Sequence, residues 1–265
     1  MIIGRLIGID RDEDALFASK KRLSNYQNVT YVWGNHENIR QHLNDINIDL
    51  VDGILLDLGV SSYQIDEATR GFSYTKNARL DMRMNQKQDL DAQYIINNYS
   101  KENLEKIFFE YGEENFSKRI ASKIVSEREN KKIETTFELA DIIRSAAPKG
   151  GVDSFKRIFQ ALRIEVNGEL RDLKKAVEDS IMSLKNGGRL CIITFHSLED
   201  RIIKNTFAEY EGRCTCPKDF PKCVCNFKSY GKIITKKPII PTKDEQERNS
   251  RSKSAKLRVF ERNIK

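Results

Sequence analysis

The stretch DGILLDLGVSS at residues 52–62 decides the fold class, because it is almost wholly apolar until it ends in an acid and a loop of small residues. Residues 5–9, which lead to Asp10, and residues 189–195 (RLCIITF) have the same character, and VTYVW at 29–33 predicts another strand. Helical patterns separate these strands. Continuous apolar strands separated by helices indicate a mainly parallel sheet covered on both faces. We therefore predict an α/β fold.

The segments between the predicted strands carry helix signals. Residues 12–23 begin with acids and end with basic residues, which complements the helix dipole. An apolar face recurs along residues 170–184, and we expect the NGG sequence at 186–188 to end that helix. Ser197 together with Asp200 predicts the start of the next helix.

The end of the chain predicts one more strand, at residues 256–260. The residues just before it, 249–254, are basic and polar, and we expect them to form a mobile loop.

The middle of the chain has helical patterns and lacks a convincing strand pattern. Thr135 and Glu138, for example, have the spacing of a capping box at the start of a helix. We predict that residues 87–149 form an all-helical subdomain for substrate recognition. It would be inserted into an α/β domain made of residues 1–86 and 150–265.

Length, composition and charge limit the class of protein. The 265 residues include 39% hydrophobic and 32% charged residues, which is typical of a globular protein. We see no apolar run of about 18 residues and no signal peptide, so we expect a cytoplasmic protein with no membrane role. The formal net charge is +7, which favours a polyanionic partner such as a nucleic acid, although a basic enzyme without such a partner is also compatible.

Asp10 and Asp57 each end a predicted strand, at the edge where open α/β sheets bind ligands. An acid in the position of Asp10 can accept hydrogen bonds from the ribose hydroxyls of a nucleotide cofactor, but it can also cap the next helix. Asp57 precedes a loop of small residues and is a candidate catalytic hydrogen-bond acceptor. A cofactor contact and a loop cap are the alternatives for Asp57.

Four of the five cysteines are clustered near the C-terminal third of the chain, whereas Cys191 lies in an apolar strand and is expected in the core. In a cytosolic protein such a cluster points to a metal rather than to disulfides, and four thiolates can hold zinc. Free loop thiols are the alternative, because the Cys-x-Cys spacing is tighter than usual. The candidate zinc ligands are Cys214, Cys216, Cys223 and Cys225.

Long motifs occur in a fixed order over nearly the whole chain. They are DLGVSSYQID (57–66), RGFSY (70–74), LDMRM (80–84), YGEENF (111–116), RIFQALRIEVN (157–167), FHSLEDR (195–201) and RSKSAKLR (251–258). Together they resemble the ribosomal RNA small subunit methyltransferase H family, the MraW-like methyltransferases that act on cytosine N4 of 16S rRNA.

The resemblance implies a class I, Rossmann-like methyltransferase fold with an inserted all-helical subdomain. It implies S-adenosyl-L-methionine as cofactor, and as substrate the exocyclic N4 amine of a cytidine in the decoding region of 16S rRNA in the small ribosomal subunit. It also implies cofactor contacts from Asp10, Asp57 and Gln64. A further contact falls on His36, where the family often has an aromatic residue. An acceptor such as Asp57 would hold the amine N–H groups and help restore lone-pair character on the nitrogen.

The motif FHSLEDR adds candidates for substrate contact. His196 follows the strand at 189–195 and is a candidate for contact with the target base, while Arg201 is a candidate for a phosphate contact. His196 can equally be a neighbour of a helix cap with no chemical role. Basic residues in the helical region are candidates for RNA binding or simply a solvated face: Lys118, Arg119 and Lys123.

The family begins with a strand and a glycine-rich loop, and no such loop precedes Arg5 in this sequence. Because that strand is central in the family's sheet, we expect its absence to leave peptide groups of both neighbouring strands unpaired and apolar side chains uncovered. Two hypotheses follow: an active rRNA methyltransferase, or a catalytically inactive fragment that still binds RNA or the ribosome. A nicotinamide-dependent dehydrogenase is disfavoured, since no glycine fingerprint precedes Asp10.

Overall fold

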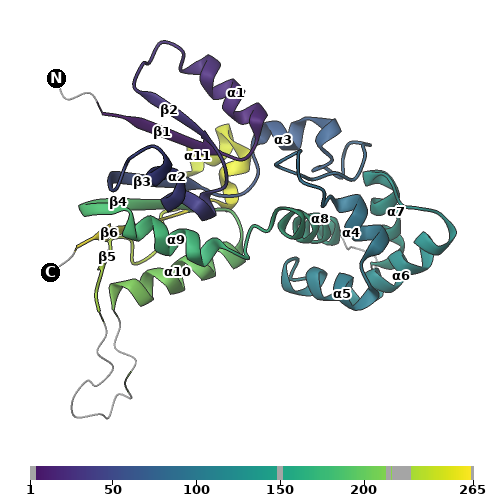
Figure 1. The fold of residues 1–265 in the computed structure, drawn as a ribbon. Coiled ribbons are helices and arrows are strands. Elements are labelled where there is room, and N and C mark those ends of the chain that lie inside the picture. The colour runs from purple at the N-terminus through teal and green to yellow at the C-terminus, as the bar shows by residue number, and fades with distance from the viewer. Residues whose placement is uncertain (1–3, 148–151, 213–215, 217–227, 264–265) are drawn as a thin grey trace. The chain divides into compact units, whose positions relative to one another are not determined.

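The structure is a computed structural model that describes residues 4–147, 152–212, 216 and 228–263. It mixes helices with two β-sheets, so the predicted α/β class is confirmed (Figure 1). Among the helices of the described part, none is both long enough and apolar enough to cross a lipid bilayer.

The chain forms two compact units. The α/β unit comprises Met1–Gly59 and Leu170–Lys265, and the helical unit comprises Val60–Glu169. The helical unit is larger than the predicted insertion at residues 87–149, because the stretch before that insertion packs with the helices. Met82 and Met84, for instance, are buried in the helical core.

The described residues of the α/β unit form two separate sheets (Figure 1). One has two parallel strands, and the other has four strands in the order β3-β4-β6-β5, with β3 and β4 parallel and β6 antiparallel to both of its neighbours. The strands are β1 (Leu6–Asp10), β2 (Val29–Trp33), β3 (Val51–Asp57), β4 (Leu184–Thr194), β5 (Gly231–Ile233) and β6 (Lys256–Arg262).

Helices pack on the four-stranded sheet to make the core of the α/β unit. Leu190 and Ile192 of β4 and Phe260 of β6 are buried together with Val177 and Phe207 from two helices. The helices of this unit are α1 (Glu13–Arg22), η1 (His36–Asn38), α2 (Ile39–Asp45), α9 (Leu173–Met182), α10 (Ser197–Glu211), α11 (Lys243–Arg248) and η3 (Ser250–Ser254).

Strands β1 and β3 each pair along only one edge within the residues that the structure describes, β1 with β2 and β3 with β4. Apolar side chains of both strands are open to solvent: Leu6 of β1 is 52% exposed and Leu55 of β3 is 64% exposed. The two sheets are connected indirectly, because α2, which follows β2, packs against α9. Lys175 of α9 also donates a hydrogen bond to the backbone oxygen of Glu37, at 3.2 Å.

Two local predictions in the C-terminal part of the α/β unit are wrong. Helix α9 ends at Met182, before the glycine pair, and Gly187 and Gly188 lie inside β4 where its pairing with β3 is irregular. A Cβ on Gly188 would lie 3.0 Å from the backbone oxygen of Asp52, so close strand contact explains this glycine better than helix termination. Of the predicted loop at residues 249–254, Ser250–Ser254 form the short helix η3.

The helical unit has a core of its own. Within its described residues the structure has helices and one isolated β-bridge, between Arg79 and Thr135. The predicted capping box is confirmed, since Thr135 and Glu138 cap each other's backbone groups at the start of α7. The helices are α3 (Ser62–Asp66), η2 (Ala68–Arg70), α4 (Ala92–Asn98), α5 (Lys101–Glu110), α6 (Ser117–Asn130), α7 (Thr136–Ala146) and α8 (Val152–Asn167).

Asn167 ties the end of α8 to the loop that precedes α4. Its side chain donates to the backbone oxygen of Met82 at 2.8 Å and accepts from the backbone nitrogen of Met84 at 2.8 Å. Arg70 donates to the backbone oxygens of Arg83 and Met84, at 3.0 and 3.1 Å. Buried backbone groups of this loop therefore find side-chain partners where no sheet is available.

Candidate active site

Asp10 stands at the carboxyl end of β1, as predicted. Its Oδ1 accepts a hydrogen bond from the backbone nitrogen of Asp12 at 2.8 Å, and Asp12, not Asp10, is the N-cap of α1. Burial raises the pKa of Asp10 above its usual value, and the hydrogen bond from Asp12 opposes that shift. The position therefore offers a carboxylate oxygen at the ligand-binding edge of the sheet.

His36 begins η1, directly after the turn that follows β2. The His42 side chain fixes this turn: its Nε2 donates to the backbone oxygen of Asn35 at 3.1 Å, and its ring lies so close to Gly34 that a Cβ there would collide with it. Burial, reinforced by the positive charge of Arg11, lowers the pKa of His36 to about 4. His36 is therefore a neutral imidazole at physiological pH.

Asn35 was not among the residues predicted from the sequence. Its Oδ1 is buried and has no hydrogen-bond donor among the described residues. A buried polar atom without a partner is costly in a folded protein and often marks a ligand contact. Nothing in the sequence signals this, because burial of one amide oxygen depends on the packing around it.

Asp57 is the last residue of β3. The backbone nitrogen of Leu58 still donates to the oxygen of Ile193 at 3.1 Å, so β4 holds the chain in place just beyond Asp57. Gly59 then turns the chain away with a φ of +86°, a conformation that favours glycine. Partial desolvation raises the pKa of the Asp57 carboxyl, and the negative charge of Glu199 raises it further.

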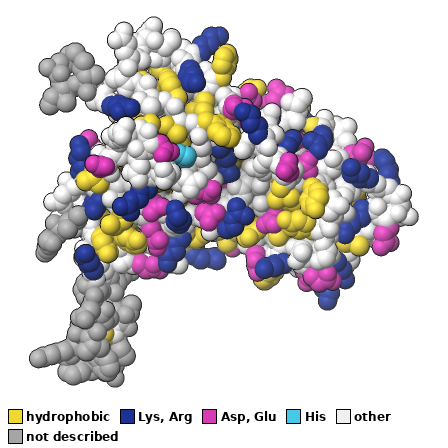
Figure 2. Space-filling view, in the orientation of Figure 1, with side chains coloured by type: hydrophobic (Ala, Val, Ile, Leu, Met, Phe, Trp, Pro, Cys, Tyr) yellow, Lys and Arg dark blue, Asp and Glu magenta, His cyan; other side chains and the backbone are white. Residues whose placement is uncertain are grey.

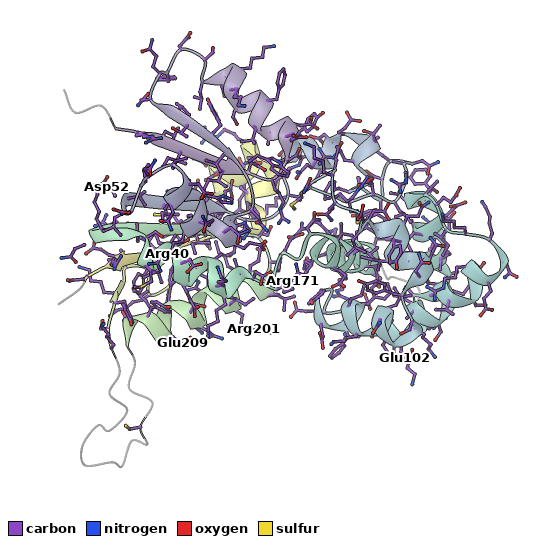
Figure 3. All side chains as sticks on the ribbon, viewed as in Figure 1. Arg40, Asp52, Glu102, Arg171, Arg201 and Glu209 are labelled. Carbon is purple, nitrogen blue, oxygen red and sulfur yellow. The ribbon has the colours of Figure 1, made fainter. Side chains whose placement is uncertain are left out.

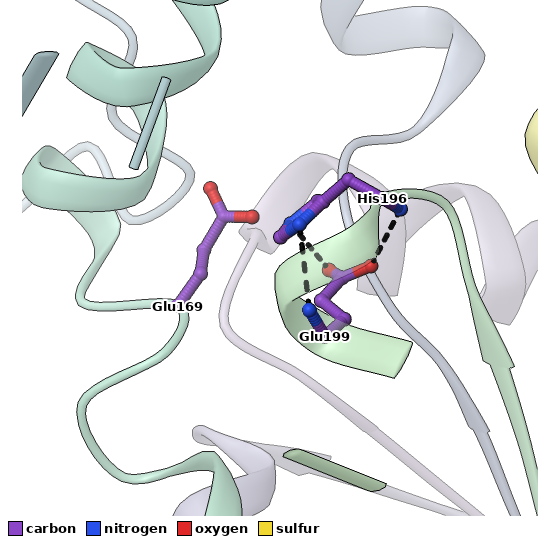
Figure 4. A group of neighbouring side chains, drawn as sticks. All are labelled: Glu169, His196 and Glu199. Carbon is purple, nitrogen blue, oxygen red and sulfur yellow. Dashed lines mark hydrogen bonds and ion pairs between the residues drawn. The ribbon is translucent and has the colours of Figure 1, made fainter. Parts of the chain in front are cut away.

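His196 is the N-cap of α10, so the prediction that Ser197 has this place is wrong (Figure 4). Glu199 completes the capping box: its Oε2 accepts from the backbone nitrogens of Phe195 and His196, at 2.8 and 3.3 Å. The Oε1 of Glu199 lies 3.1 Å from Nε2 of His196. Glu199 is 1% exposed, so a buried carboxyl group fixes the backbone and the imidazole at the end of β4.

Glu199 acts on side chains that follow or end three different strands. Its charge acts to raise the pKa values of both His36, which follows β2, and Asp57, at the end of β3. The structure therefore brings His36, Asp57 and His196 to one region of the α/β unit, at the carboxyl ends of parallel strands. Sequence reasoning missed Glu199, although its spacing of three residues from His196 is that of a capping box.

Gln64 belongs to the helical unit, where it is 5% exposed in α3. Its side-chain oxygen accepts from the backbone nitrogen of Ser61 at 2.9 Å, and its own backbone nitrogen donates to Oγ of Ser61 at 3.2 Å. This capping box gives Gln64 a local structural role. Its predicted contact with a cofactor stays a prediction.

The predicted basic contacts lie on helix surfaces. Arg201 is exposed on α10 (Figure 3). Lys118 and Arg119 are exposed on α6, where Lys123 forms an ion pair with Glu127 at 2.5 Å. Their predicted contacts with RNA stay predictions.

The predicted zinc cluster lies mostly outside the described residues. Of its members only Cys216 is described, and it is partly buried, whereas Cys214, Cys223 and Cys225 fall outside the described part of the chain. Cys191 is partly buried in β4.

Comparison with known proteins assigns the chain to a family. The family model described as the MraW methylase family matches residues 2–263. Proteins named ribosomal RNA small subunit methyltransferase H from Clostridium botulinum (strain 657 / Type Ba4) and from Clostridium botulinum (strain Kyoto / Type A2) are each 58% identical over 260 residues. Each alignment covers 97% of this chain and 84% of the relative. With this match and a Rossmann-like α/β architecture, the chain belongs to the MraW methylase family.

Proposed function

We propose that this protein transfers a methyl group from S-adenosyl-L-methionine to the N4 amine of a cytidine in the decoding region of 16S rRNA, in the cytoplasm. Membership of the methylase family supports the reaction class and the cofactor. The names of the relatives at 58% identity support ribosomal RNA of the small subunit as the substrate. The helical unit is proposed to recognise that RNA.

The polar atoms at the strand ends fit the cofactor. Asp10 and Asp57 supply carboxylate oxygens, and Asn35 supplies a buried oxygen that has no donor among the described residues. The ribose hydroxyls and the adenine amine of S-adenosylmethionine are hydrogen-bond donors, so they match this set of acceptors. The neutral ring of His36 offers a flat surface beside them. Gln64, on the helical unit, is proposed as a further contact.

The observation that carries the proposal is the placement of Asp57. It ends a strand, its pKa is raised, and the loop behind it is fixed to β4 and then turned by Gly59. The sulfonium of the cofactor supplies an activated methyl group, so the protein contributes mainly proximity and electrostatics. Asp57 is proposed to accept a hydrogen bond from the amine N–H, which orients the nitrogen and favours its lone pair.

His196 and Glu199 complete the proposed site. The capping box holds His196 at the end of β4, beside the strand that ends with Asp57. We assign His196 to contact with the target base. Glu199 is a positioning residue, because its carboxyl group is bound to His196 and to two backbone N–H groups.

The proposal is tested by incubating the protein with S-adenosylmethionine and small ribosomal subunits that lack the modification, followed by nucleoside mass spectrometry. The expected product is N4-methylcytidine. Asp57→Asn removes the charge and one acceptor oxygen, and it is expected to lower kcat by roughly 100-fold or more, the range expected when one hydrogen-bonding group that acts in the transition state is lost. Asp52→Asn is the matched control, since Asp52 is an exposed acid on the same strand, paired with Lys185 at 2.9 Å.

A different methylated nucleoside would contradict the proposal, as would equal activity of Asp57→Asn and Asp52→Asn. Absence of methyl transfer together with retained RNA binding would favour the alternative, a catalytically inactive protein that binds RNA or the ribosome. Calorimetric titration with S-adenosylmethionine separates a failure to bind the cofactor from a failure of chemistry.

A further inference from the structure

The chain returns to the candidate active site just before its last strand. Strand β6 runs antiparallel to β4, with Lys256 opposite Thr194 and Leu257 opposite Ile193. On the other side of β4, Ile193 is opposite Asp57. Neighbouring strands lie about 4.8 Å apart, so the start of β6 is only two strands, roughly 10 Å, from the strand of Asp57. Residues 248–256, named here the basic segment, lead into this position.

The basic segment has an ordered backbone. Ser252 is 5% exposed, and both its backbone nitrogen and its Oγ donate to the backbone oxygen of Asn249, at 3.0 and 2.8 Å. The backbone nitrogen of Ala255 donates to the oxygen of Ser252 at 2.8 Å. Because these hydrogen bonds hold the segment in one conformation, little conformational freedom remains to be lost when a ligand binds its side chains.

The junction between the basic segment and β6 is anchored to the helix that His196 caps. Asp200, in the first turn of α10, accepts from Arg258 through Nε at 2.6 Å and through Nη2 at 3.0 Å. Lys256 lies 3.7 Å from the same carboxyl group. A two-pronged arginine contact fixes geometry as well as charge. These contacts hold the end of the basic segment against the first turn of α10, the helix whose N-cap is His196.

The charge of the basic segment has one sign. Residues 248–256 include four basic residues and no acidic one. Arg248, Arg251 and Lys253 are exposed. By contrast, basic and acidic side chains are intermixed on the face shown in Figure 2. Guanidinium and ammonium groups together with serine hydroxyls are the groups that commonly contact nucleic-acid phosphates.

We propose that the basic segment binds backbone phosphates of the RNA strand whose base enters the candidate active site. The inference rests on the proposed function for the class of substrate, and it adds the surface that holds the RNA backbone. Phosphate contacts position a strand without reading its sequence. The basic segment would thus set the register of the RNA, while His196 and Asp57 act on the base.

The experiment compares two double variants of the full chain. Arg251→Gln with Lys253→Gln removes two exposed charges of the basic segment. Lys21→Gln with Arg22→Gln removes the same two charge types from the last turn of α1. Because α1 begins just after the carboxyl end of β1 and packs against that strand, its last turn lies toward the amino end of β1. The probe is a short synthetic single-stranded RNA containing one cytidine, and Kd is measured over a range of salt concentrations.

The basic-segment variant is expected to bind RNA more weakly, and equally so for a scrambled RNA sequence. The slope of log K against log salt should decrease by about 0.7 for each phosphate that the variant no longer binds. The control variant should keep the wild-type slope, and calorimetric binding of S-adenosylmethionine should be unchanged in both. An unchanged slope in the basic-segment variant, or an equal decrease in the control, would overturn the proposal.

The design separates this proposal from the proposed function. Methylation of cytidine with a wild-type KM in the basic-segment variant would overturn the phosphate site and leave the proposed function intact. Absence of cytidine methylation in the wild type, with RNA binding that still depends on Arg251 and Lys253, would support the phosphate site and contradict the proposed function. Vesicles containing phosphatidylserine serve as a second probe. Charge-dependent binding to vesicles but not to RNA would also overturn the proposal.

Discussion

Glu199 places a buried negative charge beside two other side chains of the candidate active site. Its replacement in Glu199→Gln keeps an oxygen for the backbone N–H groups of Phe195 and His196 but removes the charge that raises the pKa of Asp57. The pKa of Asp57 should therefore fall. An acceptor works when deprotonated and loses activity as the pH falls through its pKa, so the acid limb of the kcat/KM profile should move to lower pH.

The matched control is Glu209→Gln, since Glu209 is exposed on the same helix and pairs with Lys174 on the surface. That variant should keep the wild-type pH profile, because exposed ion pairs contribute little. A Glu199→Gln profile that overlays the wild type, or moves to higher pH, would contradict the assigned role of Glu199.

His36 should make stability depend on pH. Its pKa is lowered from the usual 6.5 to about 4, so the unfolded chain takes up a proton there more readily than the folded chain. The contribution is complete above pH 6.5 and is lost progressively as the pH falls toward about 4. Urea unfolding of the wild type and of His36→Gln at decreasing pH measures it. The free energy of unfolding should fall more steeply in the wild type, and parallel curves would rule this out.

The positions of the site acids could be predicted from the sequence, but the partners that tune them could not. Asp10 and Asp57 are visible as acids that end apolar strands, because strand direction alone places them at one edge. Asn35 and Glu199 act through burial and through contacts between distant segments. His196 was identified, but its capping role was assigned to its neighbour, since histidine is an unusual N-cap.

Gly71 closes the turn after η2 and should be among the most sensitive positions of the helical unit. Its φ is +69°, and a Cβ there would collide with the backbone oxygen of Arg79 and lie 2.8 Å from the backbone nitrogen of Asp81. Gly187, in β4, also has a positive φ of +82° but has open space around it. Gly187→Ala should cost about 1–2 kcal/mol from backbone strain alone.

Gly71→Ala should cost clearly more than Gly187→Ala, because backbone atoms that cannot move aside add a collision to the strain. Denaturant unfolding of both variants gives the comparison. Equal losses would show that the turn at Gly71 can relax, and that the loop held by Arg70 is softer than its hydrogen bonds indicate.

Elements with a continuous apolar pattern were predicted well, whereas features that depend on the pairing of one strand with another were not. Strands β2 and β3 agree with their predicted ranges to within one residue, because each contains a short run of apolar or β-branched residues that favours a strand. Strand β5 was missed, since three residues carry too little pattern and its existence depends on β6. The glycine pair in β4 was interpreted as a helix stop, because the close approach of Gly188 to Asp52 of β3 cannot be seen along the chain.

At the scale of the whole molecule, the helical unit should fold by itself. Its buried residues form one cluster that draws on the loop after η2 and on α4 to α8, and this cluster is larger than that of the α/β unit in the described residues. We expect a fragment of residues 60–169 to give a helical circular dichroism spectrum and a cooperative thermal transition. A fragment that stays unfolded would show that this core needs the α/β unit.

The two separate sheets of the α/β unit have a consequence for handling the protein. In the described residues β1 and β3 each have one edge without a strand partner, and such an edge can accept an extended segment of another chain. Exposed apolar side chains such as Leu6 and Leu55 favour that encounter. Concentrated stocks should therefore accumulate intermolecular β-structure, visible as growing light scattering and a rise in thioflavin fluorescence. Apparent specific activity would then depend on storage history, and freshly diluted protein would give the true catalytic rate.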